Sequence, residues 1–243
     1  MLGSPRAGIP KEAMAVSAEN LDHFCVCISS APQESNDKAA LLNEARWQSG
    51  EVIQATFVEG DKSLQDRVRA VAEEWTQDGR ANLKLNFVES GPADIRIAFE
   101  QGNGSWSYLG TMCRQIPSDQ PTMNYGWLTP DSDDVELRRV VLHEFGHGLG
   151  FIHEHQNPQG AIKWNEPAVI ADLSGPPNEW DEAAIRHNVL DHYDPQDTTA
   201  TNVDGDSIMM YPIPKAWTLD GFSADLNGEL SQQDLDFVHQ VYP

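Results

Sequence analysis

One segment of the chain concentrates the residues that could hold a metal ion. His143 and His147 are four positions apart, so on an α-helix their imidazoles lie on one face, one turn apart. Two imidazoles in this arrangement can bind one zinc ion, and Glu144 lies beside them, within reach of a water molecule on the metal. Gly148 and Gly150 can end the helix, and Gly150 tolerates the positive φ that a sharp turn needs.

The turn after this helix can return a third histidine, His153, to the same ion. Three protein ligands leave a position for water, which distinguishes a catalytic zinc site from a structural one. From the frequencies of His, Glu and Gly in this chain, the full pattern H-E-x-x-H-x-x-G-x-x-H arises by chance with a probability on the order of 4 × 10⁻⁵. The alternative is a buried helix whose histidines only form hydrogen bonds. Four of the eight histidines lie within thirteen residues here, which favours one catalytic Zn²⁺.

The extended motif resembles the zinc signature of the metzincin metallopeptidases, and Glu154, directly after the third histidine, narrows the resemblance to the astacin-like branch. Residues 207–211, Ser-Ile-Met-Met-Tyr, are similar to the Ser-x-Met-His-Tyr Met-turn beneath the zinc of astacins. The resemblance implies that Met209 is the Met-turn methionine and that Tyr211 ligates zinc and swings to stabilise the oxyanion. Met210 stands where many astacins have His. Without the zinc motif, the adjacent methionines would indicate core filling.

The resemblance also implies a mechanism and a substrate-binding strand. Glu144 would act as general base toward the zinc-activated water and pass the proton to the leaving amine. Residues 104–110 are similar to the astacin edge strand that binds substrate backbone, which implies that Trp106, Ser107 and Tyr108 hold an extended peptide by strand addition. The alternative for Trp106 and Tyr108 is a buried aromatic pair in an ordinary strand.

The similarity divides the chain into two parts. Residues 45–47, Ala-Arg-Trp, resemble the mature start of the astacin domain, and residues 230–234 resemble the segment before its last helix. We therefore expect a zinc metallopeptidase catalytic domain over 45–243. Residues 1–44 are rich in Ala, Ser, Pro and charge without sustained periodicity, and we interpret them as an N-terminal extension or pro-segment.

Two further roles would follow if residues 1–44 are a pro-segment. In astacins the glutamate after the third histidine pairs with the new N-terminus, which is the role implied for Glu154. Cys25 or Cys27 could supply a fourth zinc ligand in a latent form, since a thiolate binds zinc well. The alternative is that both cysteines are ordinary strand residues.

Hydrophobic periodicity predicts the elements that position the motif. Strands are expected over residues 51–58, 83–88, 94–99, 105–109 and 122–127, and helices over residues 64–75, 135–148 and 231–241. About sixty residues after the motif carry few regular signals. With the resemblance, this pattern implies an α+β, metzincin-like zincin fold. Such a fold has a twisted, mostly parallel sheet with an antiparallel edge strand, an active-site helix and an irregular C-terminal half.

Composition limits the classes of partner. The chain has 243 residues, and 16 Lys and Arg against 38 Asp and Glu give a net charge of −22. This charge disfavours binding to nucleic acids and to anionic membranes, and no apolar run is long enough to span a bilayer. We expect a monomer that binds a protein or peptide substrate, without nucleic acid or membrane. No signal peptide is evident and the three cysteines are an odd number. The compartment stays open, with an intracellular location slightly favoured over a secreted one.

The function predicted from these observations is a zinc-dependent endopeptidase. Two alternatives stay open: a latent zymogen, and a metal-dependent binding protein without turnover. The presence of both Glu144 and Tyr211 argues against the binding protein, because a protein that has lost turnover usually lacks the base.

Overall fold

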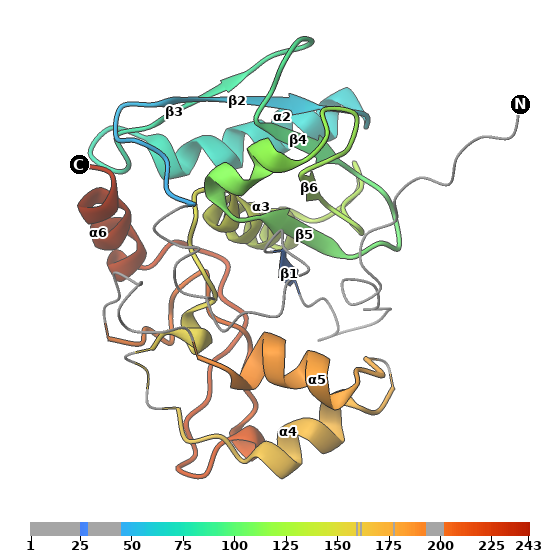
Figure 1. Ribbon diagram of the computed structural model, residues 1–243, viewed down its shortest axis with the longest axis vertical. Coiled ribbons are helices and arrows are strands. Elements are labelled where there is room, and N and C mark those ends of the chain that lie inside the picture. Colours follow the sequence, from blue (N-terminus) through green and yellow to red (C-terminus); the bar gives the residue numbers. More distant parts are fainter. Residues whose placement is uncertain (1–24, 29–44, 159, 161, 177, 193–201) are drawn as a thin grey trace, which may run out of the picture.

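The computed structural model of the chain has a sheet-based N-terminal half and a smaller helical C-terminal half (Figure 1). It describes residues 25–28, 45–158, 160, 162–176, 178–192 and 202–243. Most of the expected extension, residues 1–24 and 29–44, lies outside the described residues, as do the side chains of Cys25 and Cys27.

A six-stranded sheet with the order β1-β5-β6-β4-β2-β3 forms the N-terminal half of the described chain. Its strands are β1 (Cys25–Ile28), β2 (Val52–Phe57), β3 (Lys84–Phe87), β4 (Ile95–Ala98), β5 (Ser105–Tyr108) and β6 (Met123–Asn124). All neighbouring pairs are parallel except β5 and β6, which are antiparallel. The predicted fold class, a mostly parallel sheet with one antiparallel strand in a metzincin-like α+β fold, is confirmed.

One detail of the sheet differs from the expectation. The antiparallel strand β5 was expected at the sheet edge, but its outer side pairs with β1, in the register Val26 opposite Trp106. The edge on that side is therefore β1, which belongs to the segment before residue 45. Periodicity within β5 cannot reveal this pairing, because it depends on a strand about eighty residues earlier in the chain.

Two helices cover one face of the sheet and position the histidine motif. Helix α2 (Lys62–Ala72) begins at Asp61, whose carboxylate accepts a hydrogen bond from the Ser63 backbone N–H at 2.8 Å. Helix α3 (Asp134–Gly148) begins at Asp133, which caps Glu136 in the same way, and carries acidic residues in its first turn that suit the helix dipole. A 3-10 turn, η2 (Glu73–Thr76), extends α2.

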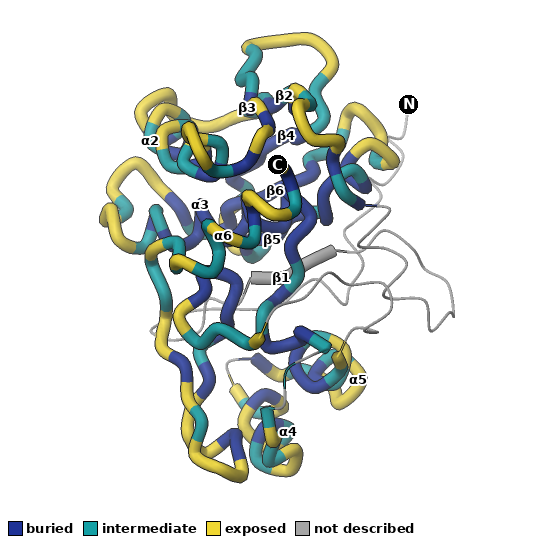
Figure 2. Tube along the Cα trace, turned by 90° about the vertical axis from the view of Figure 1, so that its left-hand side faces the viewer, coloured by how far each residue is buried: buried dark blue, intermediate teal, exposed yellow. Residues whose placement is uncertain are grey.

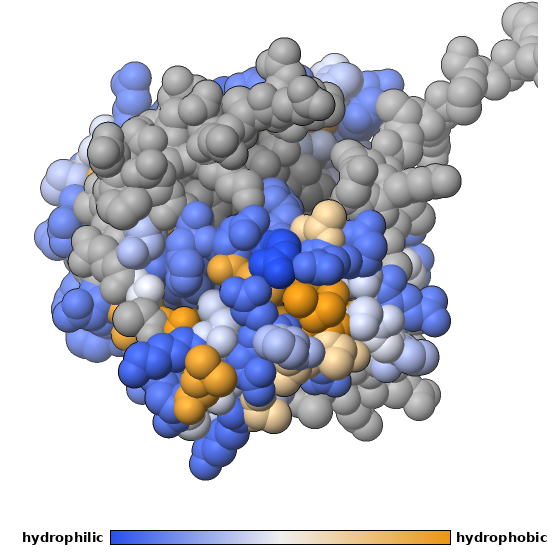
Figure 3. Space-filling view, turned by 60° about the horizontal axis from the view of Figure 1, so that its bottom comes forward, coloured by the Kyte–Doolittle hydropathy of each residue, from blue (hydrophilic) through white to orange (hydrophobic). Residues whose placement is uncertain are grey.

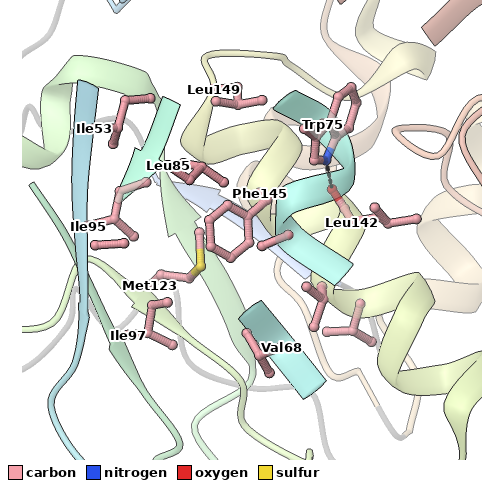
Figure 4. Close-up of a cluster of buried hydrophobic side chains, with 14 of the residues drawn as sticks. Ile53, Val68, Trp75, Leu85, Ile95, Ile97, Met123, Leu142, Phe145 and Leu149 are labelled. Carbon is pink, nitrogen blue, oxygen red and sulfur yellow. Dashed lines mark hydrogen bonds between the residues drawn. The ribbon is translucent and has the colours of Figure 1, made fainter. Parts of the chain in front are cut away.

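The main hydrophobic core lies between these helices and the sheet (Figure 4). Phe145 of α3 is fully buried among side chains from β2, β4 and β6, and Trp75 donates a hydrogen bond from Nε1 to the Leu142 carbonyl at 3.0 Å. This bond ties η2 to the turn of α3 just before His143. Helix α3 therefore packs against the core along one side, and the Trp75 indole holds its backbone by a hydrogen bond.

The C-terminal half has a separate hydrophobic cluster and more helix than the sequence pattern indicates. Figure 2 shows buried chain beside its two short helices, α4 (Glu166–Leu173) and α5 (Glu182–Ile185). A π-helical turn, η5 (Arg186–Leu190), continues α5, and the 3-10 turn η6 (Lys215–Trp217) packs on α4. The chain ends in α6 (Gln232–Val241), capped by Ser231 through a capping box with Asp234.

Few of the described residues expose a large apolar side chain. In the coloured part of Figure 3 hydrophilic residues predominate, and apolar side chains gather in one patch near the centre and in smaller groups beside it. The large hydrophobic residues that are exposed in the described chain are Val52, Val58, Val135, Leu219 and Leu226. None of the described helices combines the length and the apolar character needed to cross a bilayer.

Cys113 lies in a 3-10 turn, η3 (Gly110–Gln115), and is buried as a free thiol. Burial, reinforced by the Asp94 carboxylate, raises the pKa of this thiol to about 12. Because the thiolate is the reactive form, we expect Cys113 to resist alkylation by iodoacetamide at pH 8 in the native protein and to react after unfolding. Peptide mapping by mass spectrometry measures this, and rapid labelling of native Cys113 would contradict it.

Candidate active site

The last two turns of α3 bring two imidazoles and a carboxylate together inside the protein. His143 and His147 are buried, with ring centroids 4.8 Å apart, and Glu144 between them in sequence has no exposed surface. His143 Nδ1 lies 2.8 Å from the Ile208 carbonyl and His147 Nδ1 lies 2.7 Å from the Phe151 carbonyl. A carbonyl can only accept, so each Nδ1 donates a proton and each Nε2 keeps its lone pair for a metal ion.

The turn after α3 is set by Gly150. Its φ of 97° lies in the left-handed region, as predicted from the sequence. Gly150 N–H donates to the His147 carbonyl at 2.8 Å and Phe151 N–H to the Gly146 carbonyl at 2.9 Å, the pair of bonds of a Schellman motif. The chain therefore reverses within three residues of His147.

This reversal returns His153 to the other two histidines. The Nε2 atoms of His147 and His153 are 3.1 Å apart, and one ligand atom from each of the three buried imidazoles lies within 4.8 Å of the others. Zinc bound tetrahedrally at 2.0–2.1 Å places neighbouring nitrogens about 3.3 Å apart, so the three side chains fit such an ion. Among the described residues, His143 Nε2 is buried and has no hydrogen-bond partner, as expected of an atom reserved for a metal.

Burial also keeps the ligands in the state that binds metal. Desolvation lowers the pKa of His147 to about 4 and holds the pKa values of His143 and His153 well below the ordinary value. All three imidazoles are therefore neutral at pH 7, and their lone pairs are available to a cation.

The segment 207–211 lies beneath the histidines and has a polar framework of its own. Asp234 at the start of α6 accepts hydrogen bonds from Ser207 Oγ at 2.6 Å and from Ile208 N–H at 2.9 Å. The sulfur of Met209 packs against Gly146 of α3 so closely that a Cβ there would lie 2.3 Å from it. The predicted Met-turn methionine thus lies directly under the metal-binding turn of α3.

Tyr211 is buried next to the third histidine. Its ring centroid is 4.2 Å from that of His153 and 6.3 Å from that of His143. Glu154 is half-buried, and its carboxylate accepts hydrogen bonds from Asn157 Nδ2 at 3.0 Å and from Asp204 N–H at 3.2 Å. Desolvation raises the pKa of Glu154 to about 7. Its pairing with a new N-terminus stays a prediction.

The predicted substrate strand presents its residues on alternate faces. Ser107 faces α3, since its Oγ lies 3.8 Å from where a Cβ on Gly148 would be. Trp106 and Tyr108 point to the opposite face and form an edge-to-face pair with centroids 5.9 Å apart. The aromatic pair is therefore present in β5, whose outer side is paired with β1, and the role of these residues in substrate binding stays a prediction.

Two aromatic residues that the motif does not include hold the end of α3. Trp47 Nε1 donates to the Gly148 carbonyl at 2.8 Å, and the Tyr242 hydroxyl donates to the Leu149 carbonyl. The last carbonyls of a helix have no backbone N–H donor within that helix. The two side chains supply the missing donors to the carbonyls of Gly148 and Leu149. No local signal could reveal these contacts, because the partners are 101 and 93 residues apart.

We expect Tyr242→Phe to destabilise the zinc-free protein by about 1–3 kcal/mol, because the buried Leu149 carbonyl loses its donor while the ring stays in place. Urea unfolding measures the change. An unfolding free energy equal to that of the wild type would contradict a structural role for this hydroxyl.

Three histidine nitrogens converging on one point, a buried glutamate beside the first of them and a methionine turn underneath define a zinc metallopeptidase domain of the metzincin class. Comparison with protein families identifies the branch: the peptidase family described as Astacin matches residues 40–161, about half of the chain. The chain belongs to the astacin family of zinc metallopeptidases, which use one zinc ion.

Similar proteins support this assignment. The structure of myroilysin has 41% sequence identity and a TM-score of 0.81, and covers 84% of this chain and 98% of its own. Zinc metalloproteinase nas-30 of Caenorhabditis elegans is 30% identical over 113 residues, which are 46% of this chain but only 13% of the nematode protein. High choriolytic enzyme 1 of Oryzias latipes, at 16% identity and a TM-score of 0.54, is similar in fold alone.

Proposed function

We propose that this chain is an endopeptidase that hydrolyses peptide bonds in protein or peptide substrates and acts as a monomer. The observation that carries the proposal is the convergence of three neutral, buried histidines next to Glu144. His143, His147 and His153 would hold the ion through Nε2, with Nδ1 of the first two fixed by backbone carbonyls. When bound, zinc is a Lewis acid that activates water at neutral pH and polarises the scissile carbonyl.

The protein's own groups would perform the proton transfers. Glu144 takes a proton from the attacking water as general base and delivers it to the leaving amine as general acid. The Tyr211 hydroxyl donates a hydrogen bond to the oxyanion of the tetrahedral intermediate. Its position next to His153, with ring centroids 4.2 Å apart, supports this role.

We also propose that β5 binds substrate backbone and that residues 1–44 are a pro-segment. A peptide that adds to β5 needs the backbone groups along its outer side, and β1 occupies these groups in the intact chain. Residues 25–28 would then have to leave before a substrate can bind. As part of the same proposal, Cys25 or Cys27 would supply a fourth metal ligand in the latent form of the protein. Replacing both cysteines with Ser tests this role.

The test is hydrolysis of a reduced and alkylated, unfolded protein by the purified zinc-loaded chain, before and after limited proteolysis within residues 29–44. We expect rapid cleavage after proteolysis, slower cleavage before it, loss of cleavage with a chelator and recovery with added zinc. A trimmed, folded and zinc-loaded protein that cleaves nothing would overturn the proposed activity. Equal rates before and after trimming would overturn the pro-segment alone.

A further inference from the structure

His155 is a completely buried imidazole that touches the catalytic groups without belonging to the zinc motif. It lies in a 3-10 turn, η4 (Glu154–Gln156), and has no exposed surface. Its ring stacks on that of Tyr211, with centroids 4.5 Å apart and planes inclined by 28°. The edge of Trp164 meets it from the C-terminal half, with centroids 6.3 Å apart.

A hydrogen bond to the backbone fixes the orientation of this ring. His155 Nε2 lies 3.0 Å from the carbonyl of Asn188, which can only accept, so Nε2 carries the proton. Asn188 lies in the π-helical turn η5, whose wider turn changes which carbonyls are free to accept. The neighbouring Gln156 donates to the carbonyls of His187 and Asp191 in the same region, so two consecutive side chains anchor η4 to it.

A role as a further metal ligand does not fit these contacts. The group of side chains able to hold an ion in the described chain consists of the three motif histidines and does not include His155. Its Nε2 is already used by Asn188, and its buried Nδ1 has no hydrogen-bond partner among the described residues. A polar atom buried in this way disfavours folding, and an apolar ring would fill the same space without that cost. Packing alone therefore does not explain why a histidine stands at this position. The hydrogen bond that fixes its ring to the Asn188 carbonyl does.

We propose that His155 is a positioning residue that holds the ring of Tyr211 in the orientation its hydroxyl needs to reach the oxyanion. The tether to Asn188 fixes the imidazole, and the stacked imidazole limits the rotation and tilt of the phenol. This inference rests on the role proposed above for Tyr211. It makes the π-helical turn of the C-terminal half a part of the support for the catalytic machinery.

The experiment is a double-mutant cycle with His155→Phe and Tyr211→Phe, measured on an unfolded protein substrate and on a short fluorogenic peptide. His155→Phe keeps an aromatic ring and removes the tether. We expect it to lower kcat about 10-fold with little change in KM or in zinc affinity. In the Tyr211→Phe background the same substitution should change kcat less than about twofold, because the group through which it acts is gone.

Trp217→Phe is the matched control. It removes the partly buried hydrogen bond from the Trp217 indole to Asp172 in the same C-terminal cluster and leaves the tether from His155 to Asn188 in place, so it should leave kcat unchanged. Multiplicative effects of the two substitutions in the cycle, or an equal loss of zinc affinity with His155→Phe, would overturn the positioning role.

A second measurement does not depend on turnover. In protein with ¹³C-labelled tyrosine, the Tyr211 ring signal, assigned by its absence in Tyr211→Phe, should shift or broaden with His155→Phe in the zinc-free state as well. An unchanged signal would overturn the inference. This measurement also separates a failure of the inference from a failure of the proposed function. If the wild type is inactive but His155→Phe still perturbs the Tyr211 signal, the proposed activity is contradicted and the contact between the two rings is not.

Discussion

Replacing Glu144 with Gln should lower kcat by roughly 10²–10⁴-fold, because glutamine has nearly the same shape but cannot take a proton from water. The side chain is completely buried next to His143, so the substitution removes the base without opening a cavity. Zinc affinity should change little, since the three histidine nitrogens and their backbone partners stay in place.

Initial rates on a fluorogenic peptide, together with metal analysis of the same sample, measure this. Glu182→Gln, the same change on an exposed residue of α5 that pairs with Arg186, is the control and should leave kcat unchanged. A Glu144→Gln protein that binds zinc and retains most of its activity would show that another group acts as the base.

The largest expected loss of stability follows from Gly110→Ala. Gly110 has a φ of 41°, and a Cβ there would lie 1.8 Å from the Ala45 carbonyl oxygen, which belongs to the backbone and cannot rotate away. The same oxygen accepts a hydrogen bond from Thr111 N–H at 2.8 Å, so the strain would also break this contact. We expect a loss of about 3–5 kcal/mol.

In thermal unfolding of a domain of this size, that loss lowers Tm by roughly 6–20 °C. Gly79→Ala separates the steric effect from the conformational one, because Gly79 has a φ of 84° but nothing within 4 Å of its Cβ position. It should cost only about 1 kcal/mol. Equal losses for the two variants would show that the contact between Gly110 and Ala45 contributes nothing.

The parts of the site that could be predicted from sequence are those set by short-range geometry. The spacing of His143 and His147 on one helix face, and the positive φ of Gly150, depend only on residues within one or two turns. The strands β2 to β5 likewise carry their own alternation. In the structure the three histidines come together.

The parts that could not be predicted depend on distant segments. The pairing of β1 with β5, the bond from Tyr242 to Leu149 and the stacking of His155 on Tyr211 each join segments more than fifty residues apart. Helices α4 and α5 were missed for a different reason. They have eight and four residues, too short to show a helical period, and Pro, Asn and Asp residues surround them.

The hydroxyl of Tyr242 on the Leu149 carbonyl has a consequence for the order of events during synthesis. Translation is vectorial, and Leu149 leaves the ribosome 93 residues before its partner is made. Until that partner has emerged, the Leu149 carbonyl in the turn between the second and third histidines lacks this donor. We therefore expect zinc capture at full affinity to be a late event in biogenesis, with nascent chains stalled before residue 242 retaining the metal less tightly than completed ones.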